Sequence, residues 1–203
     1  DVYKRQVRLG GSEAGPAIGD VLFGAVNPGG KLTMTFPKSV GQIPLYYAHK
    51  NTGRPLKEGK WFEKFRSNYL DVDNDALYPF GYGLSYTTFR FSDITLNRSS
   101  IGMDNELVAS VTVTNTGDRA GSEVVQLYIR DLVGSVTRPV KELKGFEKIY
   151  LQPNESRTVR FTIAPEMLKF YNADLKFVAE PGDFDVMIGP DSRNVKTARF
   201  TLR

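Results

Sequence analysis

From residue 87 onward, hydrophobic and polar side chains alternate with a period of two, the pattern of strands that bury one face. Each run is bounded by Gly, Pro, Asn or Asp. About seven short strands separated by turn signals are typical of an immunoglobulin-like β-sandwich. The chain has no cysteine, which excludes an antibody-type disulfide and favours a fibronectin type III-like sandwich. The clearest alternating runs lie at residues 107–113, 125–129, 159–163, 184–188 and 200–202.

The first strand of this region changes phase. Phe89 and Phe91 fall on one face, whereas Ile94 and Leu96 fall on the other. An extra residue in an edge strand shifts the side-chain phase in this way. We therefore expect a bulge or bend between Phe91 and Ile94.

Residues 12–36 predict one helix and one strand. Ser12 is placed to cap a helix over 12–24, with Glu13 in the first turn, Pro16 tolerated early and Gly24 ending it. The turn at 27–30 precedes a strand over 32–36, which Pro37 stops. Since one helix and one strand cannot close a core, we interpret residues 12–45 as the end of an α/β domain.

Residues 46–86 form a long irregular stretch rich in aromatic side chains and proline. Stretches of this length without periodicity are functional loops or linkers, and the aromatic content argues against disorder. We predict an ordered loop and interdomain linker that packs on another element. Within it, Gly81, Tyr82 and Gly83 predict a tight turn that clamps two domains, because glycine lets the backbone pass close to an aromatic ring.

Two stretches of the irregular region, 46–55 and 61–69, combine aromatic rings with cationic and amide side chains. Such residues on a long loop are characteristic of binding sites. One interpretation is a sugar-contacting loop, in which rings stack on pyranoses and polar groups bind hydroxyls; the other is a surface loop with no ligand. The candidate substrate-binding residues are Tyr47, His49, Lys50, Arg54, Trp61, Arg66 and Tyr69.

Other classes of site find little support. The basic residues are scattered, so the net charge of +4 predicts no nucleic-acid footprint. No apolar run approaches the roughly 20 residues of a membrane helix. The acidic stretch 71–75 has Ala76 and Tyr82 where a calcium loop needs glycine and glutamate. No carboxylate pair or Ser-His-Asp set is apparent, so we expect no catalytic residue, no metal and no cofactor in this chain.

Several motifs together resemble the C-terminal third of glycoside hydrolase family 3, the retaining β-glucosidase and β-xylosidase family, and its periplasmic bacterial β-glucosidase branch in particular. The resemblance covers residues 12–203. It rests on the helix at 12–24, the turn Asn-Pro-Gly-Gly-Lys-Leu at 27–32, the aromatic link at 78–89, and the segments 136–146 and 180–184.

This resemblance implies the end of an α/β sandwich domain over 12–45, a linker over 46–86 and a fibronectin type III-like domain over 87–203. It implies a parent enzyme that removes terminal sugars from β-linked glycosides, periplasmic or secreted and able to form a homodimer. The family keeps its Asp nucleophile in a TIM barrel and its Glu acid/base in the upstream sandwich domain. Neither can be placed on this chain, so we expect it to be inactive alone.

Two alternatives stay open: a non-catalytic β-sandwich that binds carbohydrate or protein, and a pure spacer. The helix and strand at 12–36 favour the enzyme, because a standalone module has no need of them. Residues 1–6 fit no downstream pattern and resemble a translated sequencing adapter. We therefore interpret residues 1–11 as non-native or junction sequence.

Overall fold

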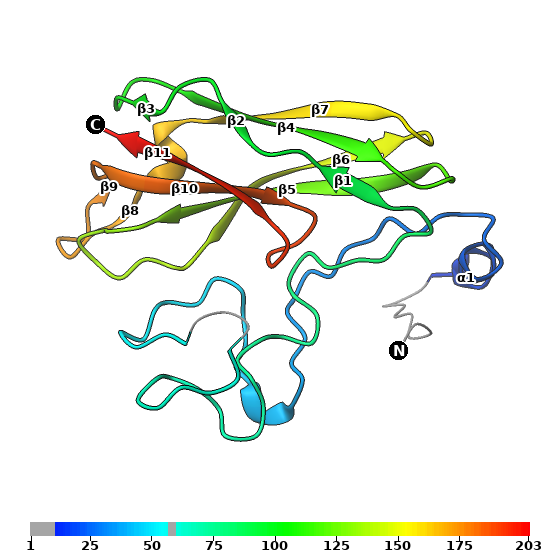
Figure 1. The fold of residues 1–203 in the computed structure, drawn as a ribbon, viewed down its shortest axis with the longest axis horizontal. Coiled ribbons are helices and arrows are strands. Elements are labelled where there is room, and N and C mark those ends of the chain that lie inside the picture. The colour runs from blue at the N-terminus through cyan, green and yellow to red at the C-terminus, as the bar shows by residue number, and fades with distance from the viewer. Residues whose placement is uncertain (1–10, 57–59) are drawn as a thin grey trace.

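The computed structural model describes residues 11–56 and 60–203; the predicted junction sequence lies almost wholly outside this range. Figure 1 shows a two-layered β-sandwich, an irregular lobe below it and a short helix to one side. The elements are α1 (Ala14–Leu22), 3-10 helix η1 (Val40–Gln42), β1 (Phe89–Phe91), β2 (Thr95–Leu96), β3 (Ser100–Ile101), β4 (Leu107–Asn115), β5 (Gly121–Asp131), β6 (Glu142–Leu151), β7 (Ser156–Ile163), 3-10 helix η2 (Pro165–Leu168), β8 (Phe170–Tyr171), β9 (Phe177–Val178), β10 (Gly182–Gly189) and β11 (Lys196–Leu202).

The sandwich confirms the predicted fold class. In one sheet, β4 pairs with β7 along one edge and with β1 and β2 along the other. The second sheet has the order β3-β11-β10-β5-β6, in which only β3 and β11 run parallel. Burial alternates strictly along β4, so every second side chain enters the core between the layers. The rings of Phe184 and Phe200 stack there, with their centroids 5.4 Å apart.

The predicted irregularity in the first edge strand is confirmed. Phe91 pairs with Val113, whereas Thr95 pairs with Ser110. Four steps along the edge strand therefore match three steps along β4, which leaves one extra residue between β1 and β2. This bulge lets the aromatic pair of β1 and the aliphatic pair around β2 pack on the same core.

Strand β6 was not among the predicted runs. It carries charged and exposed side chains along most of its length, and only Ile149 and Leu151 are buried. It lies at the edge of its sheet, where lysines discourage pairing with other chains. A register shift opposite Leu127 and Tyr128 leaves Lys144 without a partner residue. Because so few side chains of β6 are buried, its sequence lacks the alternation of hydrophobic and polar residues that predicts a strand.

Helix α1 begins later than predicted. Its N-cap residue is Glu13, whose side chain makes no capping hydrogen bond, so the expected cap by Ser12 is wrong. The end is as predicted: Gly24 has φ +80° and its N–H donates to the carbonyl of Val21. No residue of α1 is buried, and Phe23 is 92% exposed. None of the described helices is long and apolar enough to cross a bilayer.

The strand predicted over 32–36 is wrong in its extent. Leu32 and Phe36 do make backbone hydrogen bonds with the linker, at 2.8 Å to the carbonyl of Tyr82 and 2.9 Å to that of Tyr78. Only the Phe36–Tyr78 pair forms a β-bridge. The facing linker contains Pro79 and the positive-φ Gly81, and both interrupt a regular ladder.

Candidate functional site

The irregular lobe, defined as residues 37–78, is organised around a buried amide. Gln42 is fully buried. Its Nε2 donates to the carbonyls of Asp73 at 2.9 Å and Asp75 at 3.2 Å. Its Oε1 accepts from the backbone N–H groups of Lys38 at 2.6 Å and Ser39 at 3.3 Å. All four hydrogen-bonding positions of the amide are therefore satisfied, and they tie the two ends of the lobe together.

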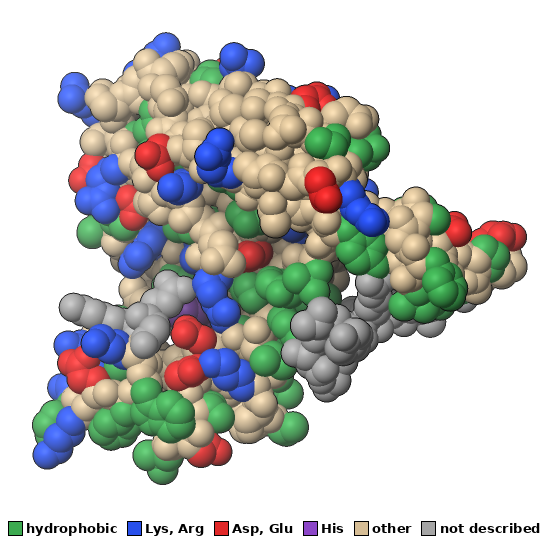
Figure 2. Space-filling model, turned by 45° about the vertical axis from the view of Figure 1, so that its right-hand side comes forward, with side chains coloured by type: hydrophobic (Ala, Val, Ile, Leu, Met, Phe, Trp, Pro, Cys, Tyr) green, Lys and Arg blue, Asp and Glu red, His purple; other side chains and the backbone are tan. Residues whose placement is uncertain are grey.

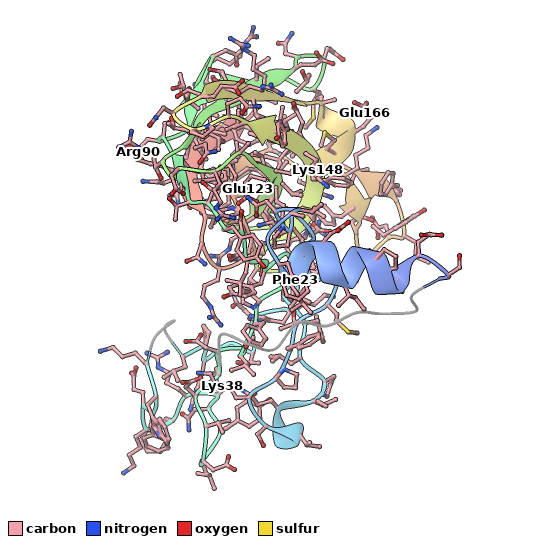
Figure 3. The ribbon with its side chains drawn as sticks, turned by 90° about the vertical axis from the view of Figure 1, so that its right-hand side faces the viewer. Phe23, Lys38, Arg90, Glu123, Lys148 and Glu166 are labelled. Carbon is pink, nitrogen blue, oxygen red and sulfur yellow. The ribbon has the colours of Figure 1, made fainter. Side chains whose placement is uncertain are left out.

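An ion pair reinforces the same junction. The Nζ atom of Lys38 lies 2.7 Å from both carboxylate oxygens of Asp73. The hydrogen bond from Lys38 lowers the pKa of the Asp73 carboxyl below its ordinary value. Figure 3 places Lys38 in the lobe, below the sandwich strands that carry Glu123 and Lys148. The acidic stretch 71–75 therefore directs its central carboxylate at a lysine.

Two of the seven candidate residues, Tyr47 and Tyr69, are half-buried and make side-chain contacts with other parts of the protein. The ring of Tyr47 stacks on Phe80 at 4.4 Å and meets Tyr128 edge-on at 5.7 Å. Its hydroxyl oxygen accepts from the N–H of Leu143 at 3.3 Å. The Tyr69 hydroxyl donates to the carbonyl of Gln42 at 3.1 Å. These contacts place Tyr47 in the joint between lobe and sandwich and Tyr69 in the lobe interior.

The other five candidates, His49, Lys50, Arg54, Trp61 and Arg66, are exposed. The structure brings their two stretches together at Ser67. The N–H of Ser67 donates to the carbonyl of Arg54 at 2.9 Å, and the hydroxyls of Thr52 and Ser67 lie 2.6 Å apart. Arg66 pairs with Glu63 at 3.1 Å. The two stretches are thus joined where residues 52–55 meet Ser67.

Two further aromatic side chains of the same stretch as Trp61, those of Phe62 and Phe65, are also exposed. Sequence reasoning pointed to the stretch 61–69 but did not select these rings. Phe65 has φ +66°, a backbone conformation uncommon for a bulky residue, and its ring carries the Lys64 ammonium 5.0 Å from its centroid. In Figure 2 hydrophobic and charged side chains lie intermixed over the lower lobe. Such a surface suits a ligand with apolar faces and many hydroxyl groups.

The clamp predicted at Gly81 is a close contact with the sandwich. Gly81 has φ +78°, and a Cβ atom there would lie 2.1 Å from Oε1 of Gln126 on β5. The Gln126 Nε2 donates to the carbonyls of Gly81 at 3.2 Å and Pro190 at 2.6 Å. The Tyr128 hydroxyl donates to Gln126 Oε1, and burial raises the pKa of Tyr128. Only glycine can bring the linker backbone this close.

A second contact fixes the turn at residues 27–30 to the sandwich. The Nδ2 of Asn27 donates to the carbonyl of Ala120 at 2.9 Å. Its Oδ1 accepts from the Ser85 hydroxyl at 2.9 Å and the Tyr86 N–H at 2.8 Å. Nearby, Lys31 pairs with Glu123 at 2.6 Å with both side chains largely buried. The linker therefore has a defined path across one end of the sandwich.

Over residues 11–56 and 60–203, no three His, Asp or Glu side chains gather in a metal-binding arrangement. Some acidic side chains form ion pairs, such as Asp73 with Lys38 and Asp185 with Arg199. Others accept hydrogen bonds from neutral groups, such as Glu180 from Ser135 and Asp191 from Asn194.

Two family models match the chain. The glycosyl hydrolase family 3 C-terminal domain covers residues 6–86, and a fibronectin type III-like domain covers residues 123–192. The chain belongs to glycoside hydrolase family 3.

Individual relatives agree with this assignment. The chain is 56% identical over 192 residues to a periplasmic beta-glucosidase of Salmonella typhimurium, covering 95% of this chain and 25% of that protein. It is 47% identical to a putative beta-xylosidase of Formosa agariphila, covering 90% and 23%. A crystal structure of beta-glucosidase from Listeria innocua in complex with glucose superimposes with a TM-score of 0.90 at 44% identity, covering 95% and 26%. The chain thus spans about a quarter of the length of these proteins.

Proposed function

We propose that this chain is the C-terminal part of a retaining β-glucosidase-like enzyme that removes terminal sugars from β-glycosides. The nucleophile and the acid/base would come from other parts of the enzyme, and the chain alone would be inactive. The observation that carries the proposal is the continuous match of 95% of the chain, at 44–56% identity, to beta-glucosidases. Retaining glycosidases need two carboxyl groups about 5–5.5 Å apart, and the motifs of this chain provide no such pair.

In this proposal the sandwich holds the lobe, and the lobe contributes to the outer part of a sugar site. The exposed side chains of His49, Lys50, Arg54, Trp61 and Arg66 would touch the substrate. Tyr47 and Tyr69 would act on it indirectly, by fixing the loop, since both have partners within the protein. The substrate class is a β-linked oligosaccharide or glycoside, whose ring faces suit aromatic stacking.

The remaining parts of the proposal concern the parent enzyme. Domain boundaries at 45/46 and 86/87, a periplasmic or secreted location and a homodimeric parent follow from the family resemblance. The location is supported by the periplasmic beta-glucosidase of Salmonella typhimurium. Sedimentation of the complete enzyme would test the dimer, and fractionation of the source cells would test the location.

The first experiment is to extend the reading frame upstream in the source DNA and to assay the resulting protein. We expect a barrel and a sandwich domain with the missing Asp and Glu, and hydrolysis of an aryl β-glucoside by the complete enzyme. The purified 203-residue chain should give no turnover. A start codon immediately upstream, with no further domain, would favour the alternative of a non-catalytic binding module. Turnover by the chain alone would contradict the proposal that the catalytic residues lie in other parts of the enzyme.

A further inference from the structure

Arg138 lies in the connector between β5 and β6, defined as residues 132–141, and makes three contacts. Its Nη2 donates a 2.7 Å hydrogen bond to Glu142 Oε2, and its Nε lies 3.7 Å from Asp131 Oδ2, an ion pair without a hydrogen bond. Its guanidinium carbon lies 4.2 Å from the ring centroid of Phe170. The side chain is only 14% exposed. A planar cation held between two carboxylates and a ring has little freedom to move.

The peptide immediately after Arg138 pairs with the candidate loop. Lys50 and Pro139 form an antiparallel β-bridge. The N–H of Val140 donates to the carbonyl of His49 at 2.9 Å. The connector therefore adds a short strand-like pairing to the stretch that carries the exposed His49 and Lys50 side chains.

Side chains of the two segments also share a hollow. Asn51 of the lobe and Thr137 and Arg138 of the connector line a cleft of about 210 Å³. Burial raises the pKa of Asp131, which also lines this cleft. The Arg138 cation opposes that effect, so loss of Arg138 would leave Asp131 buried without its counter-charge. We therefore expect the connector to change conformation when Arg138 is lost, so that Asp131 becomes more solvated.

We propose that Arg138 is a positioning residue: it fixes the connector, and through the Val140–His49 backbone bond it sets the position of the loop that carries His49 and Lys50. The contacts of Arg138 and Val140 determine the position of the loop. An effect of this position on catalysis rests on the proposed function, in which the loop contacts a sugar.

The structural part is tested by amide hydrogen exchange in the 203-residue chain, comparing the wild type with Arg138→Met and Arg138→Lys. Methionine fills the space without charge, whereas lysine keeps the charge without the planar fork. We expect the Val140 amide to exchange about tenfold faster in Arg138→Met and by an intermediate factor in Arg138→Lys. The β4 amides should be unchanged. Arg160→Met, which alters an exposed arginine of β7, is the matched control.

Glu142→Gln provides a second route if Arg138→Met does not fold. It weakens the 2.7 Å contact but leaves both side chains in place, and it should accelerate Val140 exchange by a smaller factor. Unchanged Val140 exchange in the folded variants would overturn the proposal. So would acceleration shared equally by the β4 amides, because that would indicate general destabilisation.

The catalytic consequence is tested in the complete enzyme. Loss of loop position without loss of chemistry should raise KM about fivefold in Arg138→Met while kcat stays within about twofold. Arg138→Lys should recover part of this loss. A fall in kcat at unchanged KM would contradict the positioning role. If the wild-type enzyme shows no β-glycosidase activity, the proposed function fails, and the exchange experiment still decides the role of Arg138.

Discussion

The hydroxyl of Thr87 donates a 2.6 Å hydrogen bond to the amide oxygen of Asn115, and this buried contact joins the residue that follows the linker to the end of β4. Asn115 is fully buried. Its Nδ2 donates to the carbonyls of Arg119 at 2.7 Å and Leu151 at 3.2 Å. One amide thus holds three chain segments together at this corner of the sandwich.

Replacing Asn115 with alanine should lower the free energy of unfolding of the sandwich by about 3 kcal/mol, because several buried polar groups lose their partners at once. Urea unfolding followed by far-UV circular dichroism measures this change. Thr112→Ala, on an outward-facing position of the same strand, should cost less than about 1 kcal/mol. If the two substitutions lowered the free energy of unfolding equally, the buried hydrogen bonds of Asn115 would contribute no more to stability than an outward-facing side chain.

Replacing Gly81 with alanine should destabilise the joint by about 2–3 kcal/mol, because alanine disfavours positive φ and its Cβ would collide with Gln126. The control is Gly30→Ala, where a Cβ meets no atom within 4 Å. Thermal unfolding should show a clear loss for the first variant and almost none for the second. The linker should also be cut faster by a protease in Gly81→Ala alone.

The Lys38–Asp73 pair predicts an acid dependence of the lobe. The folded-state pKa of Asp73 lies below its ordinary value of 3.8, so the pair contributes stability above that value. This stability is lost as the pH falls through the lowered pKa. Carboxyl NMR should find the Asp73 midpoint below 3.8 in the wild type and closer to it in Lys38→Met. A midpoint that does not respond to Lys38→Met would contradict the assigned cause.

Trp61 is the only tryptophan of the chain, which makes the candidate surface directly observable. In the complete enzyme we expect Trp61→Ala to raise KM for a β-linked disaccharide by about five- to tenfold with kcat nearly unchanged, because outer stacking affects binding more than chemistry. Phe146→Ala, which removes an exposed ring from β6, is the matched control. Identical kinetics for wild type and Trp61→Ala would exclude Trp61 from the sugar site.

The proposed roles of Tyr69 in stability and of Arg66 in substrate binding can be separated by a similar comparison. Tyr69→Phe removes the hydroxyl that donates to the Gln42 carbonyl and should destabilise the lobe by about 1 kcal/mol. Arg66→Ala removes an exposed side chain and should leave stability within about 0.5 kcal/mol while weakening substrate binding. Trp61 emission during urea unfolding reports the stability, and KM reports the binding. If Arg66→Ala lowered stability and Tyr69→Phe raised KM instead, the roles assigned to these two residues would be wrong.

The sandwich could be predicted because its central strands bury every second side chain, as β4 does throughout. The edge strand β6 could not, since it buries only two residues near its end. The extent of the segment at 32–36 was overestimated for a related reason. Its pairing partner, the linker around Pro79 and Gly81, determines how far a ladder can run, and no local pattern within 32–36 encodes that partner.

The candidate surface was only partly accessible to sequence reasoning. The composition of the stretches 46–55 and 61–69 identified the right kind of side chains but not which of them face solvent. Tyr47 and His49 are two residues apart, yet the first enters the joint and the second is exposed. Gln42 gave no signal at all, because the carbonyls that its amide group binds lie 31 and 33 residues further along the chain.

The polar centre of the lobe has a thermodynamic consequence. A core built on the Gln42 amide and the Lys38–Asp73 pair exposes little apolar surface when it opens, and apolar exposure is the source of the positive heat-capacity change of unfolding. The stability curve of the sandwich should therefore bend strongly with temperature, whereas that of the lobe should be nearly straight. Cooling would weaken the hydrophobic contribution to the sandwich more than it weakens the polar contacts that hold the candidate surface of the lobe.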